Sequence, residues 1–206
     1  MNRVIKRLAL GSLALPVAVI SQAHAHHPMG GEAPTSMFQG FVSGLAHPVI
    51  DLEHALFIIA VAVLASLATR LRPLHWLGFI GMTVLGAILH YSGWHSGFAE
   101  LAIALSLIVA GGFMAAGRSG AGWLIGGFLV LAGLFHGYGY GETIIGSEMG
   151  PVFAYLLGFS LSQALLLVLL TFGLKHMSLR LGRHHATALR AAGVAVAAVG
   201  GVLLFA

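Results

Sequence analysis

The sequence predicts an all-α membrane protein, a polytopic bundle of about six transmembrane helices that follows a cleaved signal peptide. Of the 206 residues, 58% are hydrophobic and 8% are charged, and the mean hydropathy is +0.95. Soluble domains contain about 25% charged residues, so this composition is typical of an integral membrane protein. The 29 glycines also suit membrane helices, because small residues let two helix backbones approach closely.

The composition excludes two other classes of protein. The chain has no cysteine, which rules out disulfides, thiolate metal sites and cysteine catalysis. A metal ion would therefore bind nitrogen and oxygen atoms, or weakly the sulfur of methionine. Of the ten Lys and Arg residues, Arg3, Lys6 and Arg7 precede the first apolar run, and the others are scattered among six acids. No basic tract remains to contact phosphates, so we expect no nucleic acid as a partner.

Residues 1–25 have the pattern of a signal peptide. A basic start is followed by an apolar run from Leu8 to Ile20 and by small residues around Ala23 and Ala25. The apolar run is short for the alternative, a retained membrane anchor, so we expect cleavage after Ala23 or after Ala25. The mature chain would then begin outside the cytoplasm.

Residues 26–37 would form a His-containing extracytoplasmic segment at the start of the mature chain. Gly and Pro within residues 28–36 indicate a surface linker rather than a helix. After cleavage at Ala23, His26 would be the third residue, where the free amine, two backbone amides and the imidazole can surround Cu(II) or Ni(II) in a square plane. His26 is therefore a candidate metal ligand, and a flexible tail is the alternative.

Residues 38–206 are expected to form a single six-helix transmembrane domain. A short amphipathic piece at residues 37–45 leads into six apolar stretches, each long enough to cross a bilayer at about 17 to 25 residues. These stretches are residues 49–69, 74–91, 98–117, 121–140, 152–174 and 187–205.

The basic residues predict the orientation, because short loops rich in Lys and Arg stay in the cytoplasm. Every acid lies in the N-terminal segment or at the opposite ends of the stretches. We therefore expect a multi-pass protein of the bacterial inner membrane with both termini extracytoplasmic. The basic residues follow the first, third and fifth stretches, at Arg70, Arg72, Arg118, Lys175, Arg180 and Arg183.

Ionisable side chains gather where the first apolar stretch begins, in the segment His47-Pro48-Val49-Ile50-Asp51-Leu52-Glu53-His54. Such groups are costly at membrane depth, and they mark functional sites. Histidines in the cytoplasmic loops are instead interpreted as packed or interfacial residues. Further candidates share the predicted extracytoplasmic leaflet with the first cluster, at the ends of later stretches: His90, His95, Glu100, His136 and Glu142.

The geometry of the first cluster depends on where the helix starts. In one continuous helix with Pro48 in its first turn, the 100° step puts His47, Asp51 and His54 on one face. Glu53 then points away from them. If the helix starts after Asp51 instead, the carboxylates and His54 rearrange. The sequence leaves open which carboxylate faces the site.

Imidazole and carboxylate donors suit Ni, Co, Zn, Cu(II) or Fe, and the missing thiolates argue against Cu(I). A metal-bound histidine usually donates its second ring nitrogen to a carboxylate or carbonyl, so some acids would orient ligands rather than bind the ion. Glu100 and Glu142 fit either role. The glycines within residues 133–142 should expose helix carbonyls and let neighbouring helices pack closely.

Two segments resemble the HupE/UreJ family of membrane proteins, which is associated with hydrogenase and urease accessory genes. Residues 47–54 match the family signature His-Pro-x-x-Gly-x-Asp-His, and residues 135–142 match its glycine-rich His/Glu segment. The resemblance covers nearly the whole mature chain and implies a secondary permease for Ni²⁺ or Co²⁺. It places five residues at motif positions: His47, Glu53, His54, His136 and Glu142.

Three positions depart from the family pattern. Asp51 replaces the signature glycine, Glu53 replaces the signature aspartate, and Tyr140 stands where relatives often have a second histidine. Glutamate keeps the charge of aspartate but moves the oxygens one methylene further, and Asp51 adds negative charge. The choice of metal is therefore expected to depend on these positions.

From these observations we expect uptake of a divalent transition-metal ion, Ni²⁺ or Co²⁺ before Zn²⁺ or Cu²⁺, and no enzymatic activity. Two alternatives stay open. One is an intramembrane zinc-dependent hydrolase, and the other is an accessory subunit that binds the metal, copper included, without transporting it. The expected partners are the metal ion as substrate, the lipid bilayer, accessory proteins of a metalloenzyme and a second copy of the chain in a homo-oligomer.

Overall fold

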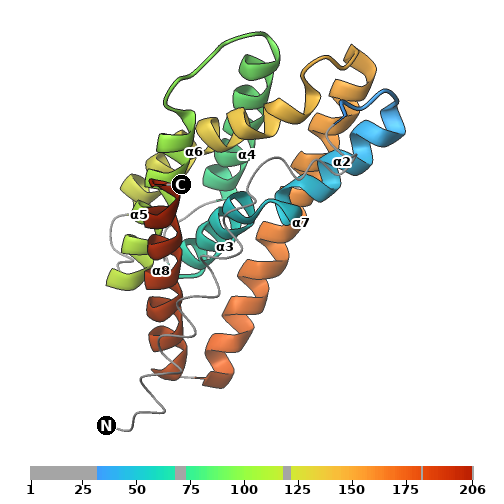
Figure 1. Ribbon diagram of the computed structural model, residues 1–206. Coiled ribbons are helices and arrows are strands. Elements are labelled where there is room, and N and C mark those ends of the chain that lie inside the picture. Colours follow the sequence, from blue (N-terminus) through green and yellow to red (C-terminus); the bar gives the residue numbers. More distant parts are fainter. Residues whose placement is uncertain (1–31, 68–72, 118–121, 182, 206) are drawn as a thin grey trace, which may run out of the picture.

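The computed structural model describes residues 32–67, 73–117, 122–181 and 183–205, and these residues form a helical membrane bundle (Figure 1). The predicted signal peptide, residues 1–25, and the candidate ligand His26 lie outside the described residues. The elements are α2 (Met37–Ile50), α3 (Leu52–Leu67), α4 (Pro73–Tyr91), α5 (Ala99–Ala116), α6 (Gly122–Gly141), the 3₁₀ turn η1 (Glu142–Ile144), α7 (Met149–Leu181) and α8 (Arg183–Leu203).

Five of the six expected apolar stretches each fall on one helix, and the first begins in the last residues of α2 and continues after Asp51 in α3. Within the described residues, four helices are long and apolar enough to cross a bilayer alone, and they are α5, α6, α7 and α8. The α2–α3 pair passes the same test as one bent span, whereas the apolar segment His75–Tyr91 of α4 is shorter. The structure therefore agrees with a polytopic bundle, and the total of six spans stays a prediction.

Of the two helix starts that the sequence leaves open, the structure has the one after Asp51. The helix α2 extends to Ile50, well beyond the short piece predicted at residues 37–45, and it meets α3 at an angle of 72°. Pro48 lies in the last turn of α2, where its missing N–H removes a helix hydrogen bond. Asp51 is extended at the bend, and its Oδ1 accepts the N–H of Glu53 at 3.2 Å. The chain thus ends one helix and caps the next within four residues.

The helix α3 occupies the middle of the bundle. Nearly all of its side chains from Phe57 to Ala65 are buried, as expected for a helix that is apolar on every side. Three helix pairs surround it, and they make the most extensive contacts in the structure: α4 with α6, α2 with α7, and α5 with α8. The bend before α3 therefore lies where this interior helix meets the helix pairs that surround it (Figure 1).

Glycines set the spacing of two of these pairs, as the sequence predicted. A Cβ atom on Gly44 of α2 would meet the carbonyl oxygen of Tyr155 and lie 2.9 Å from the backbone nitrogen of Phe159 in α7. A Cβ atom on Gly137 of α6 would meet the carbonyl oxygen of Thr83 in α4. Since Gly44 lies one turn before His47, this close approach fixes the position of a candidate ligand.

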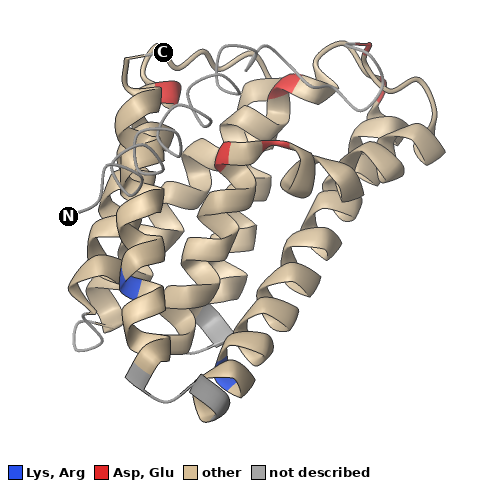
Figure 2. Cartoon of the chain, turned by 60° about the horizontal axis from the view of Figure 1, so that its bottom comes forward, with Lys and Arg blue, Asp and Glu red and all other residues tan. Residues whose placement is uncertain are grey.

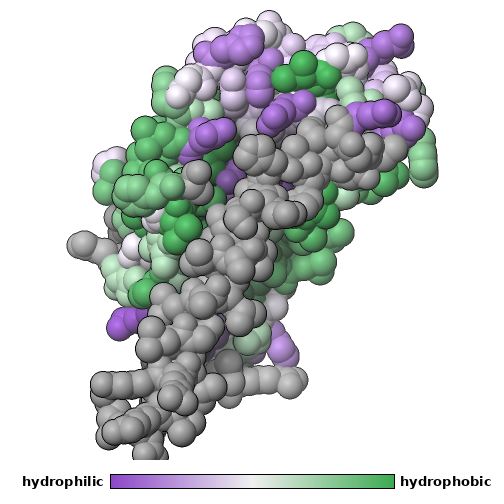
Figure 3. All heavy atoms as spheres, viewed as in Figure 1, coloured by the Kyte–Doolittle hydropathy of each residue, from purple (hydrophilic) through white to green (hydrophobic). Residues whose placement is uncertain are grey.

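Charge is sorted along the bundle. In the described residues, the Asp and Glu positions gather at one end of the bundle and the Lys and Arg positions lie toward the other, and the C-terminal end of α8 lies at the acidic end (Figure 2). Apolar surface covers much of the body in between, with hydrophilic residues concentrated at the upper end (Figure 3). This arrangement agrees with the sequence, in which basic residues follow the first, third and fifth apolar stretches and the acids lie at the opposite ends. The assignment of the acidic end to the extracytoplasmic side stays a prediction.

Candidate metal site

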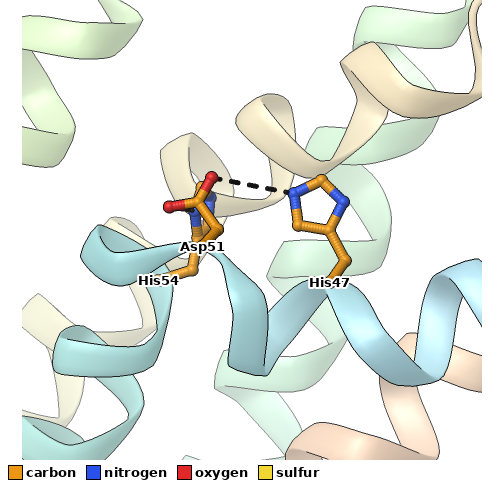
Figure 4. Close-up of side chains that lie close together, drawn as sticks. All are labelled: His47, Asp51 and His54. Carbon is orange, nitrogen blue, oxygen red and sulfur yellow. Dashed lines mark ion pairs between the residues drawn. The ribbon is translucent and has the colours of Figure 1, made fainter. Parts of the chain in front are cut away.

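His47, Asp51 and His54 come together where α2 ends and α3 begins (Figure 4). One ligand atom from each residue lies within 4.8 Å of the other two. The Asp51 carboxylate lies between the rings, with Oδ1 3.2 Å from Nδ1 of His54 and Oδ2 3.9 Å from Nε2 of His47. Both imidazoles are buried, whereas the Asp51 side chain is 36% exposed. Protein therefore surrounds the two imidazoles, and solvent reaches the group from the side of the Asp51 carboxylate.

The hydrogen bond of His54 identifies which ring nitrogen can bind a metal. Its Nε2 lies 3.0 Å from the carbonyl oxygen of His136. A carbonyl oxygen only accepts, so Nε2 carries the hydrogen, and Nδ1 of the neutral ring is an acceptor. Among the described residues Nδ1 has no hydrogen-bond partner, although it lies 3.2 Å from a carboxylate oxygen of Asp51. Two acceptors so close repel each other unless they share a proton or a metal ion.

The contacts of His47 orient its ring in the same way. Its Nδ1 lies 2.9 Å from the hydroxyl of Thr143 in η1 and 2.9 Å from the hydroxyl of Tyr155 in α7. Tyr155 donates its one hydrogen to the carbonyl of Tyr140 at 2.8 Å, so its oxygen accepts from Nδ1. The lone pair of the neutral ring is then on Nε2, the atom that faces Asp51. Such supporting bonds are usual behind metal-bound histidines.

Glu53 lies beside this group rather than away from it. A continuous helix would turn Glu53 away, but α3 begins after Asp51, which is the other arrangement that the sequence leaves open. Oε1 of Glu53 is 3.8 Å from Nδ1 of His54, and its side chain is 31% exposed. The structure thus brings both carboxylates near His54, and Asp51 is the one between the two imidazoles.

His136 supports the group from behind. Its ring stacks on Phe57 at a centroid distance of 4.0 Å and lies 5.1 Å from the ring of His54. The hydroxyl of Ser106 donates to the carbonyl of Ile103 at 2.7 Å, so it accepts from Nε2 of His136 at 2.8 Å. Nδ1 of His136 is buried and has no hydrogen-bond partner in the described part of the chain. The residue lies next to the three-residue group without belonging to it.

Two other candidate histidines are held by backbone carbonyls. The ring of His90 stacks on Tyr138 at 3.8 Å, and its Nδ1 donates to the Tyr138 carbonyl at 2.7 Å. His95 is exposed, and its Nδ1 donates to the Gly93 carbonyl at 2.7 Å. The structure does not bring either residue into the His47/Asp51/His54 group.

Glu100 and Glu142 are exposed residues at the acidic end of the bundle. Glu100 lies in the first turn of α5, and Glu142 begins η1. Both carboxylates are close enough to Glu53 to act on it electrostatically. They add negative charge near the open side of the group, which attracts cations.

The glycine-rich end of α6 exposes its carbonyls, as the sequence predicted, although it stays helical to Gly141. Three alternate carbonyl groups accept hydrogen bonds from side chains of other helices. The pairs are His136 with His54, Tyr138 with His90, and Tyr140 with Tyr155.

No sequence pattern pointed to Tyr155 or Thr143. One is a single tyrosine within an apolar stretch and the other lies in the short turn η1, and only the folded chain brings them to His47. Tyr140 is one of the positions at which the sequence departs from the family pattern. Its ring lies 4.2 Å from the ring of His54 and 4.9 Å from that of His47, so it packs against both imidazoles.

Comparison with known proteins identifies the family of this chain. A family profile described as HupE / UreJ protein matches residues 13–203. The chain belongs to the HupE/UreJ family. Protein HupE from Rhizobium leguminosarum bv. viciae is 31% identical over 199 residues, which cover 95% of this chain and 94% of that protein. No solved structure matches the chain. The family resemblance inferred from residues 47–54 and 135–142 is therefore confirmed, and it extends over nearly the whole of this chain.

Proposed function

We propose that this HupE/UreJ protein is a secondary transporter that takes up a divalent transition-metal ion, Ni²⁺ or Co²⁺, through the His47/Asp51/His54 site. The observation that carries the proposal is the donor set. Two imidazole nitrogens and a carboxylate oxygen lie within 4.8 Å of one another, at the break between two helices. Nitrogen and oxygen donors of this kind suit Ni²⁺ and Co²⁺.

The position of the site supports transport. Transporters often build their ion sites at interrupted helices, where irregular backbone lines a path through the membrane. Here the interruption is at Asp51, whose partly exposed carboxylate opens the site toward the acidic end of the bundle. With that end outside a bacterial inner membrane, Glu53, Glu100 and Glu142 would attract the cation, and the buried imidazoles would replace part of its water.

Release into the cytoplasm would follow from movement of the helix pairs around α3. The sequence contains no nucleotide-binding motif, so the energy would come from an ion gradient or from capture of the metal by an accessory protein in the cytoplasm. Membership of the HupE/UreJ family favours this function over the zinc-dependent hydrolase, whose metal would stay bound with a coordinated water.

Metal flux into proteoliposomes tests the proposal. Vesicles that contain a metal-sensitive dye and purified protein should take up external Ni²⁺ or Co²⁺. His54→Ala removes one imidazole and should lower the flux by about tenfold or more. His176→Ala is the matched control, because His176 is exposed on α7 far along the helix from the site, and its flux should equal that of the wild type. Wild-type vesicles without flux, or equal flux in His54→Ala, would contradict the proposal.

A further inference from the structure

One face of α7 is buried through the membrane and carries polar groups at regular intervals. The residues four positions apart on this face are Tyr155, Phe159, Gln163, Leu167 and Thr171, and all are buried. Every second one is polar, and eight helical residues correspond to about 12 Å. Gln163 lies near the midpoint of the apolar segment Met149–Leu179, where polar groups are most costly and usually line ion or substrate paths.

Gln163 contacts Thr83 of α4 through both atoms of its amide. Both side chains are fully buried, and both amide atoms of Gln163, Oε1 and Nε2, lie 3.3 Å from the Thr83 hydroxyl oxygen. The hydroxyl hydrogen goes to the Ile80 carbonyl, which is nearer at 2.7 Å. Thr83 can therefore accept from the amide nitrogen, whereas its longer contact with the amide oxygen competes with the shorter bond to Ile80 for the one hydroxyl hydrogen. A buried oxygen acceptor thus faces a second oxygen at the membrane midplane.

An aromatic layer separates this pair from the His47/Asp51/His54 site. Phe159 lies one turn from Gln163, and its ring packs on Tyr140 at 5.2 Å and on Tyr155 at 5.6 Å. Tyr140 and Tyr155 in turn contact the imidazole of His47. The order along the bundle is therefore first site, aromatic layer, and then the oxygen pair.

We propose that Gln163 and Thr83 form a second, transient binding site for the divalent cation, roughly 12 Å further into the membrane than Tyr155. The inference rests on the proposed transport function. Two oxygens on a six-coordinate ion with bonds of about 2.1 Å lie roughly 3.0 Å apart, close to the 3.3 Å found between Thr83 Oγ1 and Gln163 Oε1. Neutral oxygens hold a transition-metal ion more weakly than imidazole and carboxylate do. Weak binding is what an intermediate site requires, since the ion must leave it.

The competing explanation is that Gln163 and Thr83 only hold α4 and α7 together, as polar residues do between membrane helices. Comparing binding with flux separates the two roles. Gln163→Leu keeps the volume of the side chain and removes both amide atoms. The Kd of purified protein for Co²⁺ should stay within about twofold of the wild type. Co²⁺ flux into proteoliposomes should fall by about tenfold.

Three further variants sharpen the test. Thr83→Val should lower the flux like Gln163→Leu, whereas Thr83→Ser keeps the hydroxyl and should retain it. Ser160→Ala is a control on the same helix, because the Ser160 hydroxyl already donates to the Leu156 carbonyl at 2.6 Å. Its flux should be that of the wild type.

The outcomes distinguish this inference from the transport proposal itself. Wild-type vesicles without Co²⁺ flux would refute both. Wild-type flux that is unchanged in Gln163→Leu and in Thr83→Val would refute the second site alone. A fall in flux that is matched by an equal fall in Co²⁺ binding and in thermal stability would show that the pair is structural, and it would also refute the second site.

Discussion

Removing the two hydroxyl groups behind His47 should weaken metal binding without touching a ligand. Nδ1 of His47 lies 2.9 Å from each hydroxyl, so Tyr155→Phe leaves Thr143 as an acceptor. We expect the metal affinity of Tyr155→Phe to fall by about tenfold, the low end for residues that support a ligand. Adding Thr143→Val removes the second hydroxyl that lies 2.9 Å from Nδ1. The double variant should lose about 100-fold, or roughly 2.8 kcal/mol of binding free energy.

Calorimetric titration of the purified protein with Ni²⁺ measures these affinities. Tyr91→Phe is the matched control, because it removes a tyrosine hydroxyl that donates to the Ser147 carbonyl at 3.0 Å instead of supporting a ligand. Its Kd should equal that of the wild type. If the double variant bound Ni²⁺ as tightly as the wild type, the assignment of Nε2 of His47 as a donor would be refuted. If Tyr91→Phe lost as much affinity, the loss would reflect general loosening of this end of the bundle.

Two other results should follow from the geometry. Asp51→Asn should lower Ni²⁺ affinity by more than about tenfold and Glu53→Gln by about threefold, because Asp51, unlike Glu53, lies between the two imidazoles. Equal losses of affinity for the two variants in calorimetric titration would contradict this ranking. Gly44→Ala drives a Cβ atom into the backbone of Tyr155 and should destabilise the fold by about 1–3 kcal/mol in thermal unfolding. Gly112→Ala has open space around its Cβ and should be neutral or slightly stabilising, so similar losses for both glycines would count against the close-packing explanation.

The helices could be predicted because their signal is local. Each apolar stretch is long enough to form a membrane helix without reference to the others, and all but the first, which is interrupted at Asp51, coincide with one helix of the structure. The bend at Asp51 could not be predicted in the same way. Pro48 suits the first turn of a helix as well as an interruption, and Asp51 suits a helix interior less well than a cap. The close packing of Gly44 against α7, one turn before His47, is a tertiary contact that no local pattern contains.

In the candidate site, too, the local part could be predicted and the part that depends on tertiary packing could not. His47, Asp51 and His54 are near one another in the chain, so they stay together whether the helix continues or breaks. The sequence grouped His90 and His95 with them only by membrane side, and the structure turns these side chains to the carbonyls of Tyr138 and Gly93. Side-chain direction on separate helices depends on how the helices pack, which no local pattern contains.

The two hydroxyl groups that orient His47 come from still further along the chain. Tyr155 and Thr143 lie about 100 residues away, in α7 and in η1. Neither residue type is a metal ligand of the kind sought from sequence, so their part becomes visible only once the hydrogen bonds are known.

X-ray absorption spectroscopy of the Ni²⁺-loaded protein tests the central claim most directly. The account predicts a first coordination shell of nitrogen and oxygen only, at about 2.0–2.2 Å, with multiple scattering from two imidazoles. In His54→Ala the same spectrum should show one imidazole. Sulfur in the first shell, or two imidazoles that persist in His54→Ala, would contradict the assignment of His47, Asp51 and His54 as the metal site.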